Sequence, residues 1–139
     1  MQTNALNELI GTLGLFQTKL FQYQFHLSDE YLTIKDDILA RTYSINRLMS
    51  EVGGILLKRG ETPISTCGEF IEYAWIKEHP YYVSLTDEQL IDDLILDLKS
   101  ILDALNDNQK YFTEDELILA IFTRIRNVIS EEIGILRKK

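Results

Sequence analysis

The sequence has 139 residues, 45% of them hydrophobic and 26% charged, a composition that excludes a largely disordered chain. Its 22 acids and 14 bases give a formal charge of −8, so the surface as a whole repels nucleic acid and anionic lipid. No apolar run approaches the roughly 20 residues that cross a bilayer, the start lacks a signal-peptide pattern, and a single cysteine, Cys67, excludes an internal disulfide. We therefore expect one domain over residues 1–139, cytoplasmic and without a membrane partner.

Two long helices are predicted in the first half of the chain, from about Asn4 to Leu27 and from about Thr33 to Lys58. The first ends at the polar residues 28–30, and the second ends at Gly60 with Pro63 beyond it, the usual order of stop signals. The apolar stripe of the first helix consists of Leu6, Leu9, Ile10, Leu13, Phe16, Leu20 and Tyr23. The apolar stripe of the second consists of Ile38, Ile45, Leu48, Met49, Val52, Ile55 and Leu56.

Three helix starts are predicted in the second half, each from the pattern Thr-x-x-Glu or Thr-x-x-Gln. In this capping box the hydroxyl and the longer side chain satisfy each other's free backbone N–H groups. The boxes lie at residues 66–69, 86–89 and 113–116. They open a short helix before Pro80, a long helix with apolar residues from Leu90 to Leu105, and a last long helix with apolar residues from Leu117 to Ile133.

The helix lengths predict an all-α fold, an antiparallel four-helix bundle with a short helix in the long middle connection. Helices of about 20 to 26 residues span roughly 30 to 39 Å and bury their stripes only against one another. Short connections make the first and second long helices, and the third and fourth, antiparallel neighbours. The link from Gly60 to Leu85 is long enough to return along the whole bundle.

Few residues suggest catalysis or metal binding. The sequence holds two histidines and no Gly-rich phosphate loop. His26 and Glu30, four residues apart, are weak candidate metal ligands, because the helix is predicted to end between them and two residues do not enclose a metal. The adjacent acids at 36–37, 92–93 and 131–132 point about 100° apart on a helix, and we interpret them as solvated surface.

Aromatic residues form two groups that admit two interpretations. They either contact another subunit or fill the core of a monomer. The groups are Phe16, Phe21, Tyr23 and Phe25 in the first helix, and Tyr73, Trp75, Tyr81 and Tyr82 in the middle connection.

Several segments together resemble the Dps group of the ferritin-like superfamily. They are Thr18-Lys19-Leu20 with the aromatics that follow, Tyr-Leu-Thr-Ile at 31–34, the Gly-x-x-Pro turn at 60–63, the stretch from Ile64 to Glu72, and Ile121-Phe122-Thr123. These segments occur in the same order as in the group and together span nearly the whole chain. It implies a shell of twelve subunits that oxidises ferrous iron with peroxide at a centre shared by two subunits and stores the ferric product. Some members of the group also coat DNA.

The positions where this group carries its ferroxidase ligands hold no metal ligand here. The resemblance places them at Phe21, Lys35, Leu39, Ser50 and Gly54. Neither an aliphatic, an aromatic nor a cationic side chain replaces a carboxylate or an imidazole at ferrous iron. We therefore expect no catalytic residue, no cofactor-binding residue and no metal at the standard positions, with iron possible only as stored cargo.

The resemblance thus implies a Dps-like cage, a dodecamer, for iron storage, iron sequestration or stress protection. DNA binding is not expected, because the charge is −8 and no base precedes Lys19 in a basic N-terminal arm. Two alternatives stay open. One is a divergent ferroxidase that oxidises and stores iron through other ligands, and the other is a plain helical interaction module.

Overall fold

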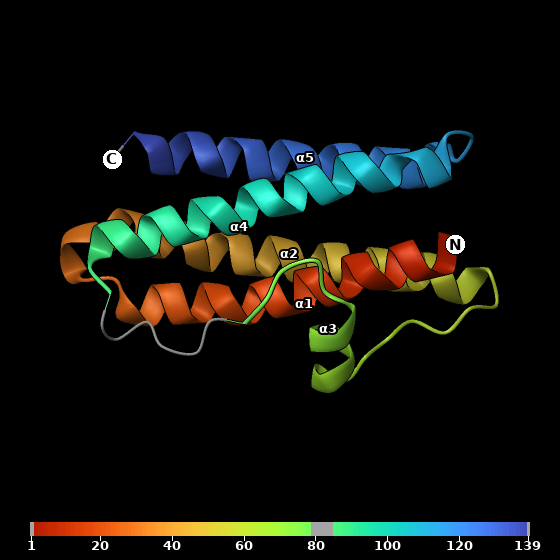
Figure 1. The fold of residues 1–139 in the computed structure, drawn as a ribbon, viewed down its shortest axis with the longest axis horizontal. Coiled ribbons are helices and arrows are strands. Elements are labelled where there is room, and N and C mark those ends of the chain that lie inside the picture. Colours follow the sequence, from red (N-terminus) through yellow and green to blue (C-terminus); the bar gives the residue numbers. More distant parts are fainter. Residues whose placement is uncertain (1, 79–84, 139) are drawn as a thin grey trace.

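The fold is a bundle of four long helices (Figure 1). The computed structural model describes residues 2–78 and 85–138. The helices are α1 Gln2–His26, α2 Leu32–Lys58, α3 Cys67–Tyr73, α4 Asp87–Asn108 and α5 Glu116–Arg137, with 3-10 turns at Asp29–Tyr31 and Gln109–Phe112. The predicted fold class is therefore confirmed, and Cys67 opens the short helix as an exposed residue.

Each long helix runs antiparallel to both of its neighbours (Figure 1). α1 packs against α2 and α4, and α5 packs against α4 and α2, so the two diagonal pairs run parallel. This arrangement requires the chain between α2 and α4 to return along the bundle, and it does so past α1, carrying α3 with it. The predicted crossing of the middle connection is confirmed.

The core lies on the predicted stripes. All seven stripe residues of α1 are at most 3% exposed. In α5 the ring of Phe122 meets Phe112, from the turn before that helix, edge to face at 5.4 Å, and both are fully buried. No helix within residues 2–78 and 85–138 has the length and apolarity needed to span a membrane.

Two of the three predicted capping boxes are confirmed, and the third is wrong. Thr66 with Glu69, and Thr86 with Gln89, form complete boxes. α5, however, is capped by Asp115, whose carboxylate accepts a hydrogen bond from the backbone N–H of Ile118 at 3.2 Å. Thr113 directly follows the 3-10 turn that ends at the buried Phe112, and its backbone lies in the right-handed helical region. An N-cap residue needs a non-helical backbone, so Thr113 does not cap α5.

Three polar side chains of α1 hold the middle connection by its backbone. The Asn7 carboxamide oxygen accepts from the N–H of Ile64 at 3.0 Å, and the Thr12 hydroxyl accepts from the N–H of Trp75 at 2.8 Å. The Lys19 ammonium donates to the carbonyl of Lys77 at 2.8 Å. All three α1 residues are at most 6% exposed, so these bonds satisfy groups that water does not reach.

A glycine on α1 makes room for the short helix. A Cβ atom built on Gly14 would lie 2.7 Å from the ring of Phe70 in α3. No real Cβ tolerates that distance, so an added methyl group forces Phe70, and α3 with it, away from α1.

We expect Gly14→Ala to lower the free energy of unfolding by about 1 to 3 kcal/mol because of this overlap. Gly134→Ala is the matched control, since Gly134 is an exposed glycine of α5 with nothing within 4 Å of a built Cβ. It should raise the free energy of unfolding by up to about 1 kcal/mol, the gain in helix propensity. Urea unfolding measures both, and a stabilised Gly14→Ala would contradict the close approach.

Candidate functional site

The helix faces at the α1–α2 turn expose a patch of large apolar side chains, which we call the aromatic patch. Phe21 and Phe25 lie one turn apart on α1 with ring centroids 6.1 Å apart, and Phe25 is 72% exposed. The other members lie at intervals of seven and four residues along one stripe of α2. The full patch is Phe21, Phe25, Leu32, Leu39 and Tyr43. Exposed apolar groups of this size mark contact surfaces.

Three of the five ligand positions implied by the resemblance belong to this region. Phe21 and Leu39 are patch members, and Lys35 shares the α2 stripe, where its ammonium pairs with Asp29 at 3.3 Å. The other two positions, Ser50 and Gly54, line a shallow groove near the opposite end of α2, beside Leu117 and Ile121 of α5.

One chain does not bring these five positions together. Lys35 and Gly54 are 19 residues apart within the single helix α2, which is roughly 28 Å at 1.5 Å per residue. A site built from all five positions therefore needs a second chain to place its Ser50 and Gly54 end against the aromatic patch of the first.

The weak candidates His26 and Glu30 lie on either side of a helix end, as the sequence predicted. His26 is the last residue of α1 and Glu30 lies in the following turn, and both are exposed. Among the residues described, the structure has no group of three or more His, Cys, Asp or Glu side chains placed to hold a metal ion.

The aromatic residues divide between the two interpretations. Phe16 and Tyr23 are core residues, whereas Phe21 and Phe25 are exposed. Tyr73 and Trp75 are partly buried against the core. Tyr81 and Tyr82 lie outside the described residues.

The adjacent acids are only half solvated, which corrects the expectation of a solvated face. Asp36, Asp92 and Glu131 are exposed, but their neighbours turn inward. Successive helix residues point about 100° apart, so a pair at the edge of the buried face places one carboxylate on each side. The inward members are Asp37, Asp93 and Glu132.

Two buried charged clusters result. In the first, the Lys19 ammonium pairs with Asp97 at 2.7 Å, and the Tyr23 hydroxyl lies 2.9 Å from carboxylate oxygens of both Asp93 and Asp97. Burial raises the pKa of Asp97, and the hydrogen bond and charge of Lys19 oppose that rise. The sequence signal was a lysine inside the apolar stripe of α1.

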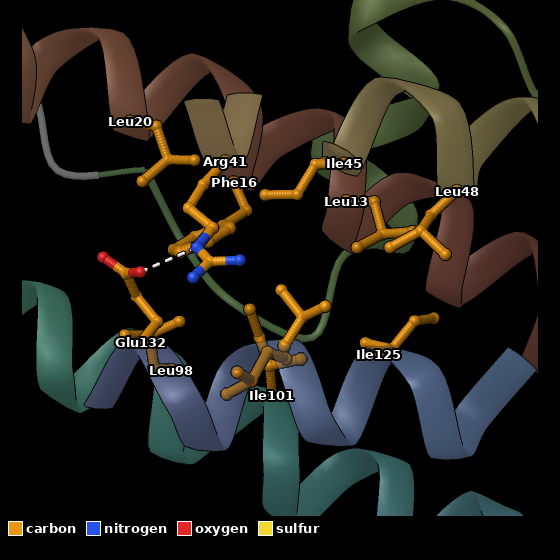
Figure 2. A pocket seen from close by; sticks show the side chains of 12 residues that line it. Leu13, Phe16, Leu20, Arg41, Ile45, Leu48, Leu98, Ile101, Ile125 and Glu132 are labelled. Atoms are coloured by element: carbon orange, nitrogen blue, oxygen red, sulfur yellow. Dashed lines mark hydrogen bonds and ion pairs between the residues drawn. The ribbon is translucent and has the colours of Figure 1, made fainter. Parts of the chain in front are cut away.

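The second cluster lies between α2 and α5. Arg41 donates to Glu132 at 2.9 Å (Figure 2). It also donates to Glu131 at 3.3 Å. The pair borders a cavity of about 20 Å³, whose other lining residues are apolar side chains from all four long helices. Sequence analysis missed this cluster, because only the crossing of α2 and α5 shows that Arg41 and Glu132 meet.

No family model matches the sequence. The DNA protection during starvation proteins of Listeria innocua serovar 6a and Listeria monocytogenes serovar 1/2a are each 30% identical to the chain over 99 residues. That match covers 70% of this chain and 64% of each relative, a little under two thirds of their length.

Solved structures share the fold. Dps from Listeria innocua soaked with zinc has a TM-score of 0.90 at 23% identity, covering 99% of this chain and 94% of that one. Dps from Listeria monocytogenes gives 0.90 at 24% identity, covering 98% of this chain and 90% of that one. Dps from Staphylococcus aureus gives 0.89 at 16% identity, covering 98% and 92%.

We expect Asp97→Ala to lower the free energy of unfolding by about 3 kcal/mol, because it leaves the buried Lys19 ammonium without its counter-ion. The matched control is Asp92→Ala, an exposed acid of the same helix, which should change stability by no more than about 0.5 kcal/mol. Urea unfolding at neutral pH measures both. Equal effects of the two variants would contradict a structural role for the Lys19 cluster.

Proposed function

We propose a function for this chain on the premise that it is homologous to Dps (DNA protection during starvation protein), a ferritin-like family. It assembles into a closed, cytoplasmic homo-oligomeric cage, on the order of twelve chains, that sequesters or stores iron and protects the cell under stress. The cage lacks a standard ferroxidase centre. The homology does not favour the alternative of a plain helical interaction module.

The observation that carries assembly is the aromatic patch. Phe25 is 72% exposed, Tyr43 71% and Leu32 57%, all on α1 or α2. Leu57, Leu96 and Leu117 are exposed elsewhere on the chain. Burying such a side chain is worth roughly 1.5 to 3 kcal/mol, and several together drive association. A contact between identical chains in a homo-oligomer buries these side chains.

The complementary surface lies on the same chain. Ser50 and Gly54 have little or no side chain, and a Cβ built on Gly54 meets nothing within 4 Å. In an isologous contact both chains use the same surface. The large side chains of the aromatic patch on one chain would then pack against the small residues Ser50 and Gly54 on the α2 helix of the other. Shape therefore supports an apolar contact at the positions where the resemblance places metal ligands.

The charges argue against metal oxidation at that contact. Lys35 carries a positive charge within the region and repels Fe²⁺. Phe21 and Leu39 offer no donor atom. Iron is therefore cargo in this proposal. The cage does not bind DNA, because each chain contributes −8 to a field that repels phosphates.

We expect the protein to form a particle of about twelve chains at micromolar concentration, measured by native mass spectrometry. Phe25→Glu should break it into smaller species, because a charge replaces an apolar contact at each interface. Phe25→Tyr, which keeps the ring, should leave the particle whole.

Circular dichroism checks that the Phe25→Glu chain still folds, as expected for a residue outside the core. A wild-type protein that remains monomeric or dimeric across this range would remove the cage from the proposal.

We expect Fe²⁺ oxidation by peroxide, followed by absorbance in the assembled protein, to run near the uncatalysed rate. A variant with Phe21→His, Lys35→His, Leu39→Asp, Ser50→Asp and Gly54→Glu supplies the imidazole and carboxylate donors that ferrous iron takes. This variant should gain a fast phase that saturates with iron.

The oxidation rate of the wild-type protein shows whether it has a ferroxidase centre, whether or not the variant assembles. A fast, saturable phase of about two irons per site in the wild-type protein would show that other residues form a working centre.

A further inference from the structure

The cluster between α2 and α5 contains more negative than positive charge. Asp37 and Arg41 come from α2, and Glu131 and Glu132 come from α5. The Glu132 side chain is 5% exposed and that of Arg41 19%, whereas that of Glu131 is 66% exposed and solvated. Within the buried part, one guanidinium therefore faces two carboxylates.

Two oxygens of this cluster have no hydrogen-bond partner. One carboxylate oxygen of Glu132, Oε2, accepts from Arg41 at 2.9 Å, and Oδ1 of Asp37 lies 3.9 Å from the same nitrogen. The remaining oxygens, Glu132 Oε1 and Asp37 Oδ2, are buried without a donor. Buried acceptors left unsatisfied are costly, and two carboxylate oxygens satisfy each other only when one of them carries a proton.

Among the described residues that line the adjoining cavity, Arg41 and Glu132 are the charged ones. Around the adjoining cavity, α1 and α4 contribute only apolar side chains, namely Leu13, Phe16, Leu20, Leu98 and Ile101. A bound proton balances the buried charge directly, since it leaves one guanidinium, one carboxylate and one neutral acid.

We propose that Asp37 and Glu132 bind one proton between them, and that this proton fastens the C-terminal half of α5 to α2. When it is bound, Oε1–H of Glu132 donates to Oδ2 of Asp37, while Glu132 Oε2 keeps its bond from Arg41. When it is lost to solvent, the pair carries two negative charges against one guanidinium. The Asp37 side chain, 23% exposed, provides the route by which the proton exchanges with water.

The direction of the pH effect follows from the burial of Glu132. Burial first, and then the hydrogen bond with Asp37, raise the pKa of Glu132 from its usual 4.5 to about 8. The folded state therefore holds a proton that the unfolded chain releases above about pH 4.5. The stabilisation is fully present below that pH and is lost as the pH rises to about 8, with the unfolding equilibrium shifting by up to tenfold per pH unit.

The test compares urea unfolding of the purified protein from pH 5 to pH 9 for wild type, Glu132→Gln and Glu131→Gln. Glutamine is permanently neutral and its amide donates to Asp37 as the protonated acid would, so Glu132→Gln should lose the fall in stability between pH 5 and pH 8. Glu131→Gln, a change at the solvated neighbour, should keep it. A Glu132→Gln profile equal to that of wild type would overturn the proposal.

A second measurement needs no variant and stands if Glu132→Gln fails to fold. Infrared difference spectra of the wild-type protein between pH 7 and pH 9 should show the loss of one carboxylic-acid C=O band. A spectrum with carboxylate bands alone at pH 7 would show that no proton is held, and the proposal would fall.

Discussion

The fold depends on how the middle connection is held against α1. An antiparallel bundle whose diagonal helices run parallel needs a chain segment that returns the length of the molecule. Such a segment has backbone groups that no helix satisfies, and unsatisfied buried groups are expensive. Asn7, Thr12 and Lys19 meet this need from one helix, at 3.0, 2.8 and 2.8 Å. Because Lys19 also pairs with Asp97, the same residue ties the connection to α4.

The fold was predictable because the helix periodicity and most of the caps are local in sequence. The buried stripe of α1 and the boxes at Thr66 and Thr86 follow from neighbouring residues alone. The cap of α5 was not predicted correctly: Asp115 takes the place expected of Thr113, which lies in helical backbone geometry beside the buried Phe112. Local pattern determines where a helix forms, and tertiary packing moves its first residue.

The candidate site was less predictable, because its features depend on distant pairs. The spacing of Arg41 and Glu132, 91 residues apart, carries no signal before α2 and α5 are placed side by side. The adjacent acids were interpreted as solvated surface because neighbours point about 100° apart on a helix, yet that same rotation puts Glu132 inside. The resemblance identified positions at both ends of α2, but a single chain holds them roughly 28 Å apart.

The five positions lie on the surface, so the contacts made there are separate from the core packing that stabilises the bundle. Phe21, Leu39 and Ser50 are exposed, and Lys35 and Gly54 are partly exposed, so none of them belongs to the buried core that stabilises the bundle. Substitutions at exposed positions usually change the free energy of unfolding by no more than about 0.5 kcal/mol. In the proposed function, mutation at these five positions would exchange a metal site for a subunit contact without removing any residue of the buried core.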